Sequence, residues 1–551
     1  MKDGRRFAAN ECEQLTNVNP TPRPDAKPRM DRRSLQPHCM HQHLFNPTFG
    51  FLMNRPALPI ALCILAHLFL FVPSIVSAEE STTAKTPSYY NDVRPIFQAN
   101  CQGCHQPAKA SGDYVMTSFA AMLKGGESEE TAIVPGKPDA SHLIEEITPE
   151  DGAAEMPKNA KPLSDVEIET ITNWIAAGAV DDTPDGAATA YSMENPPVYN
   201  SLPIVTSLDF SPDGELLAVS GFHEVLIHKS DGSELVARLV GLSERVQDVA
   251  FSPDGSMLAV AGGNPARMGE VQVWNVAERE LFASVPATYD TVFGVSWSPD
   301  NKFVAFGCTD NSLRAIDVES GKQVLLQRAP NDWTLDTVFS KDGSHVVSVG
   351  RDMAVKLTHF ETERFIDNIT SITPGALKGG LTAVDRHPER DEIIVGGDDG
   401  IPRAYRMFRK TNRVIGDDSN LIRQFPTMDG RIFDIAYSKD GKRVVAGTSL
   451  NGKGQVFVYD CKYDFELPEE ISKIEQKAVG GRNGDEKKKL AEFRKKDVTV
   501  HAKMEGQHGA VYAVAYHPNM KTVASSGYDG LIRLNDVDSG ELTKEFAPVP
   551  Q

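Results

Sequence analysis

A short segment with the pattern strand, Pro-Asp-Gly-type turn, strand recurs from residue 208 onward and limits the folds open to this chain. Each copy is followed by a further apolar run such as VQVWNV or LIRLNDV. A repeat of this length with four strands is typical of a β-propeller, because one such unit cannot bury its sheet alone. Seven copies predict seven blades. They are LDFSPDGELLAVSG at 208, VAFSPDGSMLAVAG at 249, VSWSPDNKFVAFGC at 295, TVFSKDGSHVVSVG at 337, VDRHPERDEIIVGG at 384, IAYSKDGKRVVAGT at 435 and VAYHPNMKTVASSG at 514.

These copies resemble WD repeats in a degenerate form, because related residue pairs replace the Trp-Asp pair. The resemblance implies an all-β propeller over residues 201–551 that can serve as a docking platform for proteins. The replacing pairs are Trp274-Asn275, Ile316-Asp317, Tyr459-Asp460 and Asn535-Asp536.

Polar residues inside the repeats are interpreted as structural. Four aspartates precede tight turns, where a carboxylate accepts nearby backbone N–H groups. His508 with Ser525 or Ser526 and Asp529 looks like a Ser/His/Asp set. WD repeats use such a trio to brace a blade, so we assign no catalytic residue. The four turn aspartates are Asp310, Asp352, Asp399 and Asp529.

The copies begin 41 to 51 residues apart, except for one spacing of 79 residues. The long spacing indicates an insertion at about 462–498, with near-balanced charge and apolar residues such as Leu490 and Phe493 at helical spacing. We expect a solvated helix or a mobile flap. An arm that binds a partner is the alternative.

The stretch NCQGCH at residues 100–105 carries the strongest chemical signal. Two cysteines at this spacing can be half of a zinc site, a redox dithiol or, with the histidine, a haem attachment site. A structural zinc site needs four ligands, and beyond residue 78 the other cysteines are the distant singletons Cys308 and Cys461. A dithiol centre would need a thioredoxin-like context, which this Gly-, Ala- and Pro-rich continuation lacks. The motif therefore predicts covalent haem.

Two helices are predicted on either side of a loop-rich middle. Val93, Ile96 and Phe97 lie at helical spacing directly before the cysteine motif. Ser164 and Glu167 form the pattern of a capping box at the start of the second helix. The apolar face of that helix comprises Ile168, Ile171, Trp174 and Ile175.

Haem iron in small electron carriers takes methionine or histidine as its second axial ligand. Met116 and Met122 lie in a probable short helix, where methionine is more often core filler. His142 reads as a surface or capping residue. Met156 stands in a loop directly before Pro157, where a lone methionine has little packing reason. We therefore favour Met156.

Residues 89–179 resemble the planctomycete-type cytochrome c domain. The resemblance rests on NDVRPIFQANCQGCH, LKGGESEETAIVPGKPDASHLIEEI and EMPKNAKPLSDVEIETITNWIAAGA. It implies one haem c per chain, attached through Cys101 and Cys104, with His105 as the proximal ligand and Met156 as the distal ligand. The segment ASGDYVMTS departs from the apolar pattern of the family, which affects packing rather than ligation.

The chain from Arg55 to Ala78 has the features of an export signal: a positive residue, an apolar run and small residues at the cleavage position. Residues 53–78 are therefore a predicted signal peptide, or an N-terminal anchor if the apolar run at 56–76 is retained. We expect the rest to be periplasmic or in the cell envelope. Residues 1–52, which include the cluster HCMHQH, are interpreted as an upstream extension from a mis-assigned start, with a metal-binding extension as the alternative.

Charge restricts the partners of the exported part. Residues 1–78 hold 9 of the 57 basic and 5 of the 76 acidic residues, which leaves 48 against 71 for the remainder. The resulting net charge of −23 argues against binding to nucleic acid, because nucleic acids bind to basic protein surfaces. It favours neutral or basic partners. The predicted domains are 85–182 for a small all-α cytochrome, 183–200 for a linker and 201–551 for the propeller.

Three functions are compatible with this organisation. The first is a monohaem electron carrier with an unidentified redox partner and a propeller for docking. The second is a haem-dependent oxidoreductase that binds its substrate at the propeller, and the third is a scaffold with structural haem. Ligation by histidine and methionine closes both faces of the iron, so Met156 favours electron transfer over catalysis.

Overall fold

The computed structural model describes most of the chain from residue 86 to residue 550. The predicted extension (1–52), the predicted signal segment (53–78) and residues 184–190 of the linker lie outside the described residues. Within the described part, no helix has both the length and the apolar character needed to cross a membrane. The described ranges are 86–106, 109–117, 119–128, 130–150, 152–158, 160–183, 191–371, 377–413 and 418–550.

The first described part is a small helical region. The helix predicted before the cysteine motif is confirmed as η1 (Tyr89–Val93) and α1 (Arg94–Asn100). The predicted capping box of α4 (Asp165–Ala176) is also confirmed, because Ser164 accepts the Glu167 N–H at 3.4 Å and donates its own N–H to the Glu167 carboxylate at 2.8 Å. The other elements are β1 (His105–Gln106), β2 (Lys109–Ala110), η2 (Ser111–Asp113), α2 (Phe119–Lys124), η3 (Pro138–Ala140) and α3 (His142–Ile147).

An aromatic cluster holds these helices together. The ring of Trp174 on α4 stacks on Tyr89 at a centroid separation of 5.3 Å and meets Phe97 of α1 edge-on at 6.3 Å. All three side chains are buried, and each large apolar side chain contributes about 1.5–3 kcal/mol when fully buried. The helix that leads into the cysteine motif is thereby fixed against α4.

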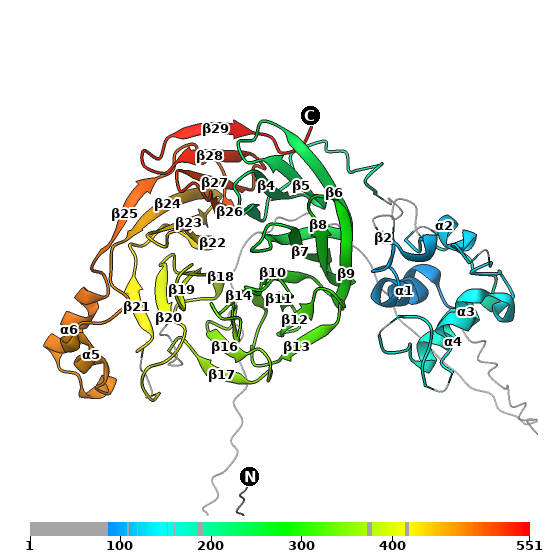
Figure 1. Cartoon of the computed structure of the whole chain (residues 1–551), viewed down its shortest axis with the longest axis horizontal. Coiled ribbons are helices and arrows are strands. Elements are labelled where there is room, and N and C mark those ends of the chain that lie inside the picture. The colour runs from blue at the N-terminus through cyan, green and yellow to red at the C-terminus, as the bar shows by residue number, and fades with distance from the viewer. Residues whose placement is uncertain are drawn as a thin grey trace, which may run out of the picture. The chain divides into compact units, whose positions relative to one another are not determined.

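Beyond the linker the structure is mostly β, in six antiparallel sheets. Five sheets have four strands each in chain order, and one sheet has seven. Figure 1 shows the sheets following one another around a common centre, with β10, β14, β18 and β22 on the inside. This arrangement agrees with the WD-repeat β-propeller predicted from the sequence.

The strands are short, as expected for repeats of this length. The seven-stranded sheet comprises β3 (Leu208–Phe210), β4 (Leu216–Ser220), β5 (Phe222–Lys229), β6 (Leu235–Phe251), β7 (Met257–Asn264), β8 (Met268–Asn275) and β9 (Glu280–Thr288). The next two sheets comprise β10 (Val292–Trp297), β11 (Phe303–Cys308), β12 (Leu313–Asp317), β13 (Gln323–Gln327), and β14 (Thr334–Phe339), β15 (His345–Gly350), β16 (Val355–His359), β17 (Phe365–Asn368). The last three comprise β18 (Leu381–Arg386), β19 (Glu392–Gly397), β20 (Arg403–Arg406), β21 (Leu421–Gln424); β22 (Arg431–Tyr437), β23 (Arg443–Leu450), β24 (Lys453–Cys461), β25 (Val498–Lys503); and β26 (Val511–Tyr516), β27 (Thr522–Gly527), β28 (Ile532–Asp536), β29 (Leu542–Phe546).

The seven-stranded sheet owes its size to β6, which is 17 residues long. Its first part pairs with β5, where Leu239 lies opposite Val225, and its last part pairs with β7, where Val249 lies opposite Val260. One continuous strand therefore takes part in two consecutive repeats. In the other sheets a loop separates the last strand of one repeat from the first strand of the next.

The hydrophobic core lies between successive sheets. For example, Val347 and Val349 of β15 belong to one cluster with Ile393 and Val395 of β19. All four side chains are at most 1% exposed. The middle strands face a neighbouring sheet on both sides, which explains the continuous apolar runs that follow each Pro-Asp-Gly-type turn.

The first and last sheets meet without sharing a strand. The N–H of Val205 donates to the Gly527 carbonyl at 3.0 Å, and a ring nitrogen of His228 lies 2.9 Å from the Pro548 carbonyl oxygen. Around these contacts, Leu208 and Phe210 pack in one cluster with residues of β26 to β28. Side-chain packing closes this seam.

The insertion between β24 and β25 is folded. It contains α5 (Glu469–Glu475), η4 (Val479–Gly481) and α6 (Gly484–Phe493), and has a small core of Ile471, Ile474 and Leu490. The helical part of our expectation is confirmed. The mobile flap is wrong, because apolar side chains and buried ion pairs hold the insertion in place.

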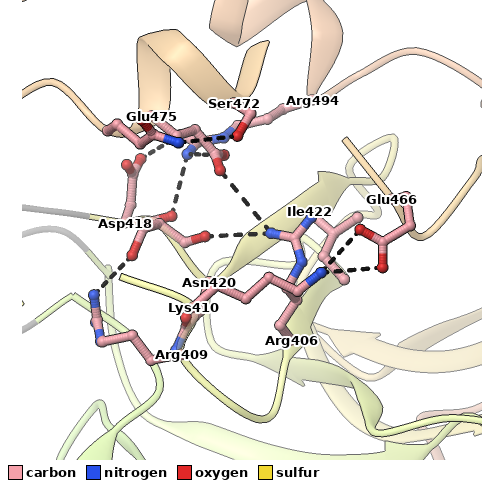
Figure 2. A network of polar contacts seen from close by, with 12 residues as sticks. Arg406, Arg409, Lys410, Asp418, Asn420, Ile422, Glu466, Ser472, Glu475 and Arg494 are labelled. Carbon is pink, nitrogen blue, oxygen red and sulfur yellow. Dashed lines mark hydrogen bonds and ion pairs between the residues drawn. The ribbon is translucent and has the colours of Figure 1, made fainter. Parts of the chain in front are cut away.

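Figure 2 shows the ion pairs that join the insertion to the sheet of β18 to β21. The Arg494 guanidinium bonds to the Asp418 carboxylate and lies 3.5 Å from the Glu475 carboxylate, which is also 4.0 Å from Arg406 of β20. Arg406, Arg494 and Glu475 are buried. The backbone contributes too, since the Gln424 N–H of β21 donates to the Arg494 carbonyl at 2.8 Å.

Candidate functional site

The cysteine motif is a tight turn that continues from α1. The Cys101 N–H donates to the Phe97 carbonyl at 2.9 Å, and the Cys104 and His105 N–H groups both donate to the Cys101 carbonyl at 3.1 Å. Both cysteines are free thiols. Cys101 is half-buried and Cys104 exposed, so the turn presents two thiols and an imidazole from four consecutive positions.

The imidazole of His105 is oriented by a neighbouring segment. Its Nδ1 lies 3.2 Å from the Tyr114 carbonyl oxygen, and the Tyr114 ring meets the imidazole at a centroid separation of 5.4 Å. The Met116 N–H donates to the His105 carbonyl at 2.8 Å. With a proton on Nδ1 for the Tyr114 carbonyl, Nε2 is left to bind a metal. Burial also lowers the pKa of His105, which favours the neutral, ligating form.

Burial has the opposite effect on Cys101 and raises the pKa of its thiol to about 12. The chain without haem therefore holds this cysteine as a neutral thiol at neutral pH.

Met156 lies at the edge of the same core. Its side chain and that of Cys101 are both partly buried and pack against one hydrophobic cluster. Its N–H donates to the Glu146 carbonyl at 2.9 Å, which ties the loop to α3. The Cys101 thiol and the Met156 thioether thus pack against one core, and the set of two thiols, an imidazole and a thioether fits haem c.

The other candidate ligands have different surroundings from Met156. Met116 and Met122 are fully buried members of the core, as expected of filler side chains. The Nδ1 of His142 lies 2.8 Å from the Glu130 carboxylate and 3.4 Å from that of Glu145, at the surface. Met156 therefore stays our predicted distal ligand.

Sequence reasoning missed the residues that hold the motif. Besides Tyr114, the amide of Gln102 is buried and donates to the Met116 carbonyl at 2.9 Å. The Ser111 N–H donates to the Cys104 carbonyl at 2.9 Å. The segment that makes these contacts is ASGDYVMTS, where the family pattern is broken, and that departure was the available signal.

In the sheets, the turn aspartates are confirmed as acceptors and have a second role. Each turn aspartate also forms an ion pair with the arginine or lysine four residues later. Asp529 pairs with Arg533 at 2.6 Å, whereas His508 is exposed, so the apparent Ser/His/Asp set is not assembled. The other three pairs are Asp310 with Arg314 at 2.5 Å, Asp352 with Lys356 at 2.6 Å and Asp399 with Arg403 at 2.7 Å.

Comparison with protein families agrees with both parts of this description. Residues 101–159 match the model of the planctomycete cytochrome C family. Residues 199–224 and 499–536 match the WD domain, G-beta repeat, and residues 265–335 match the WD40 domain of anaphase-promoting complex subunit 4.

Individual relatives match part of this chain. Coronin-7 of Mus musculus is 27% identical over 204 residues, which cover 35% of this chain and 22% of the relative. Eukaryotic translation initiation factor 3 subunit I of Xenopus tropicalis is 22% identical over 301 residues, or 50% of this chain and 89% of the relative. The chain thus spans about a fifth of the length of the Coronin-7 relatives that it matches.

Proposed function

We propose that this chain, in which a planctomycete-type cytochrome c domain precedes a WD-repeat region, is an exported electron carrier with one covalent haem. The observation that carries the proposal is that Cys101 and Met156 pack against one core. The imidazole of His105 is oriented by the carbonyl of Tyr114, which packs against the same core, and Cys104 is a free thiol in the same turn. Haem bound there would supply reversible one-electron exchange.

The chain's own residues have separate tasks in this proposal. The two thiols attach the haem, and the Tyr114 carbonyl holds the imidazole of His105 in one tautomer and orientation. With haem bound, the Met156 thioether would be the second ligand of the iron and would keep small ligands away from it. A methionine ligand would also favour the reduced state.

The sheets act as a platform for a protein partner. WD repeats and the relatives named above support this role. When the two parts of β6 are counted separately, each described repeat has four strands, which supports the seven blades predicted from the sequence. Cleavage of the linker at Pro184 should leave the haem spectrum intact and slow reduction by the native redox partner.

The ligand assignment is tested at Met156. The ferric protein should show the sulfur-to-iron charge-transfer band of His/Met haem, and the ferrous protein should bind carbon monoxide slowly or not at all. Met156→Ala should lose the band, lower the reduction potential and bind carbon monoxide readily.

Met116→Ala and Met122→Ala are the matched controls and should retain the band. Immediate carbon monoxide binding by the wild type, or loss of the band in either control, would overturn the proposed ligand and promote the haem-enzyme alternative.

Export is tested at the N-terminus. The residues at Val76-Ser77-Ala78 fit a cleavage site, so we expect the mature protein to begin near Glu79. N-terminal peptides from the native protein can be identified by mass spectrometry. Peptides from residues 1–52 would contradict the assignment of the upstream extension.

A further inference from the structure

The inner strands of the sheets surround a cavity of about 1210 Å³. The inner strands run in the same direction in every repeat, because all repeats have the same strand order. The first residues of these strands therefore lie at one mouth of the cavity. No residue of the haem motif lines it.

Aromatic side chains form the rim at that mouth. Phe293 at the start of β10 stacks with Trp333, directly before β14, at a centroid separation of 5.8 Å. Phe433 of β22 meets Tyr512 of β26 edge-on at 5.0 Å. Trp333 is 37% exposed, so part of its side chain is accessible to a ligand.

Carboxyl groups line the cavity beyond this rim. Asp248, Asp336 and Asp434 occupy equivalent positions on three inner strands, and each accepts a backbone N–H of the next repeat at 2.7 or 2.8 Å. Asp209 and Asp385 lie two residues further along their own strands and accept in the same way at 2.7 Å. In the described structure, none of these five carboxyls forms an ion pair with a cation.

Two further carboxyls of the lining are at the rim, with the two arginines that line the cavity. Arg431 bonds to Asp398. Arg351 lies 4.7 Å from the centroid of the Trp333 ring and 3.9 Å from the Asp332 carboxylate. The lining thus contains seven carboxyl groups and two guanidinium groups, and both guanidinium groups already contact a carboxylate of the rim. The remaining titratable groups of the lining are the tyrosines Tyr437, Tyr512 and Tyr516.

We propose that this aromatic mouth receives a lysine or arginine side chain from an exposed loop of a partner protein. The rings at the rim offer apolar contacts to the stem of such a side chain and cation–π contacts to its charged head, and the inner carboxyls supply the opposite charge. The net charge of −23 beyond residue 78 favours a basic partner as well. The inference rests on the proposed docking role of the WD repeats and specifies the chemistry of the docked group.

Proton linkage gives the proposal a distinctive signature. Burial raises the pKa of Asp209 to about 8 and that of Asp434 to about 7, and it also raises the pKa of Asp248, Asp336 and Asp385. A bound cation stabilises the ionised carboxylates, so binding releases protons. A lysine remains charged throughout, so affinity should rise between pH 6 and pH 8.5, up to about tenfold per pH unit for each fully coupled group.

The test uses the exported, haem-loaded chain and four dye-labelled nonapeptides of serine and glycine with Lys, Arg, norleucine or Glu at the centre. Fluorescence anisotropy should show that the Lys and Arg peptides bind about tenfold more tightly than the norleucine peptide, as expected for a cation–π contact together with opposite charge. The Glu peptide should bind more weakly still.

Variants assign the binding to the mouth. Trp333→Ala should weaken Lys-peptide binding about tenfold, and Asp434→Asn should weaken it and flatten its pH dependence. Tyr289→Ala, which changes a more exposed aromatic residue outside the lining, and Asp464→Asn at an exposed position should change neither. Circular dichroism verifies that every variant is folded.

Equal binding of the Lys and norleucine peptides would overturn the proposal, as would an unchanged affinity in Trp333→Ala. Binding that Ca²⁺ alone reproduces, with no discrimination among peptides, would assign the cavity to a metal instead. The haem spectrum of the same samples separates the outcomes: an intact spectrum without peptide discrimination rejects this inference and leaves the proposed electron carrier standing.

Discussion

The helical region and the sheets use polar side chains in contrasting ways. In the sheets, the polar groups that recur from repeat to repeat are paired, as in the ion pair of Asp352 with Lys356. In the helical region, the groups of the cysteine motif occur once, and the thiols of Cys101 and Cys104 are free. The recurring turn aspartates are therefore structural, whereas the two thiols of the cysteine motif are available for chemistry.

The largest effect that would test this contrast is expected at the cysteine motif. Replacement of both Cys101 and Cys104 by alanine should abolish covalent haem, because both attachment atoms are removed. Acid-acetone extraction should leave one haem on the wild-type polypeptide and none on the variant. Cys308→Ala, a cysteine buried in a sheet, should keep the full complement. Stoichiometric covalent haem in the double variant would contradict the assignment.

A smaller but substantial effect is expected at the insertion. Glu475→Gln removes the carboxylate that faces Arg406 and Arg494. Arg494 keeps its bond to Asp418, but the buried guanidinium of Arg406 loses its ion pair, which should cost up to about 3–5 kcal/mol of unfolding free energy. Calorimetry of the full chain measures the change.

Figure 2 also contains the control, the exposed pair of Glu466 with Lys410 at 2.9 Å. Glu466→Gln should cost less than about 1 kcal/mol. Equal effects of the two substitutions would show that burial of the network contributes little.

The pH dependence of stability should differ between the two regions. Burial raises the pKa of Asp209 to about 8, above its value in the unfolded chain, so folding takes up a proton. This contribution is complete below pH 4 and is lost as the pH rises through 8, at no more than about 1.4 kcal/mol per pH unit for one group. The sheets should therefore be more stable at pH 6 than at pH 8.5.

Far-UV circular dichroism during unfolding follows the sheets, and the haem spectrum follows the helical region. Asp209→Asn should flatten the pH dependence of the first probe only, and the exposed Asp464→Asn should not. An unchanged slope in Asp209→Asn would mean that this carboxyl ionises freely in the fold.

The smallest effects are expected at two capping boxes, one in each region. Ser164→Ala at α4 and Asn483→Ala at α6 each remove a side-chain acceptor for a backbone N–H and should cost about 1 kcal/mol. The temperature at which the haem spectrum is lost should fall in Ser164→Ala and stay unchanged in Asn483→Ala. A shift of that spectrum in Asn483→Ala would show that the insertion and the haem site are coupled.

Sequence reasoning succeeded where the determining residues are close together in the chain. The helix before Cys101 and the capping box at Ser164 depend on residues within one or two helical turns. Each repeat likewise contains the residues that form its own Pro-Asp-Gly-type turn. It failed for the insertion, because Arg494 reads as solvated until Asp418, 76 residues away, is brought beside it. The continuous β6 and the cavity depend on how repeats pack, which a single repeat does not encode.

The seam between the first and last sheets has a consequence for synthesis. Leu208 and Phe210 obtain their packing partners in the last sheet only after the ribosome has made β26 to β28. At 5–20 residues per second the roughly 300 intervening residues take roughly 15–60 s, and throughout this time the apolar face of the first sheet is uncovered. During this time the exposed apolar face of the nascent chain needs protection from aggregation. Synthesis of the last forty residues supplies the strands that cover it.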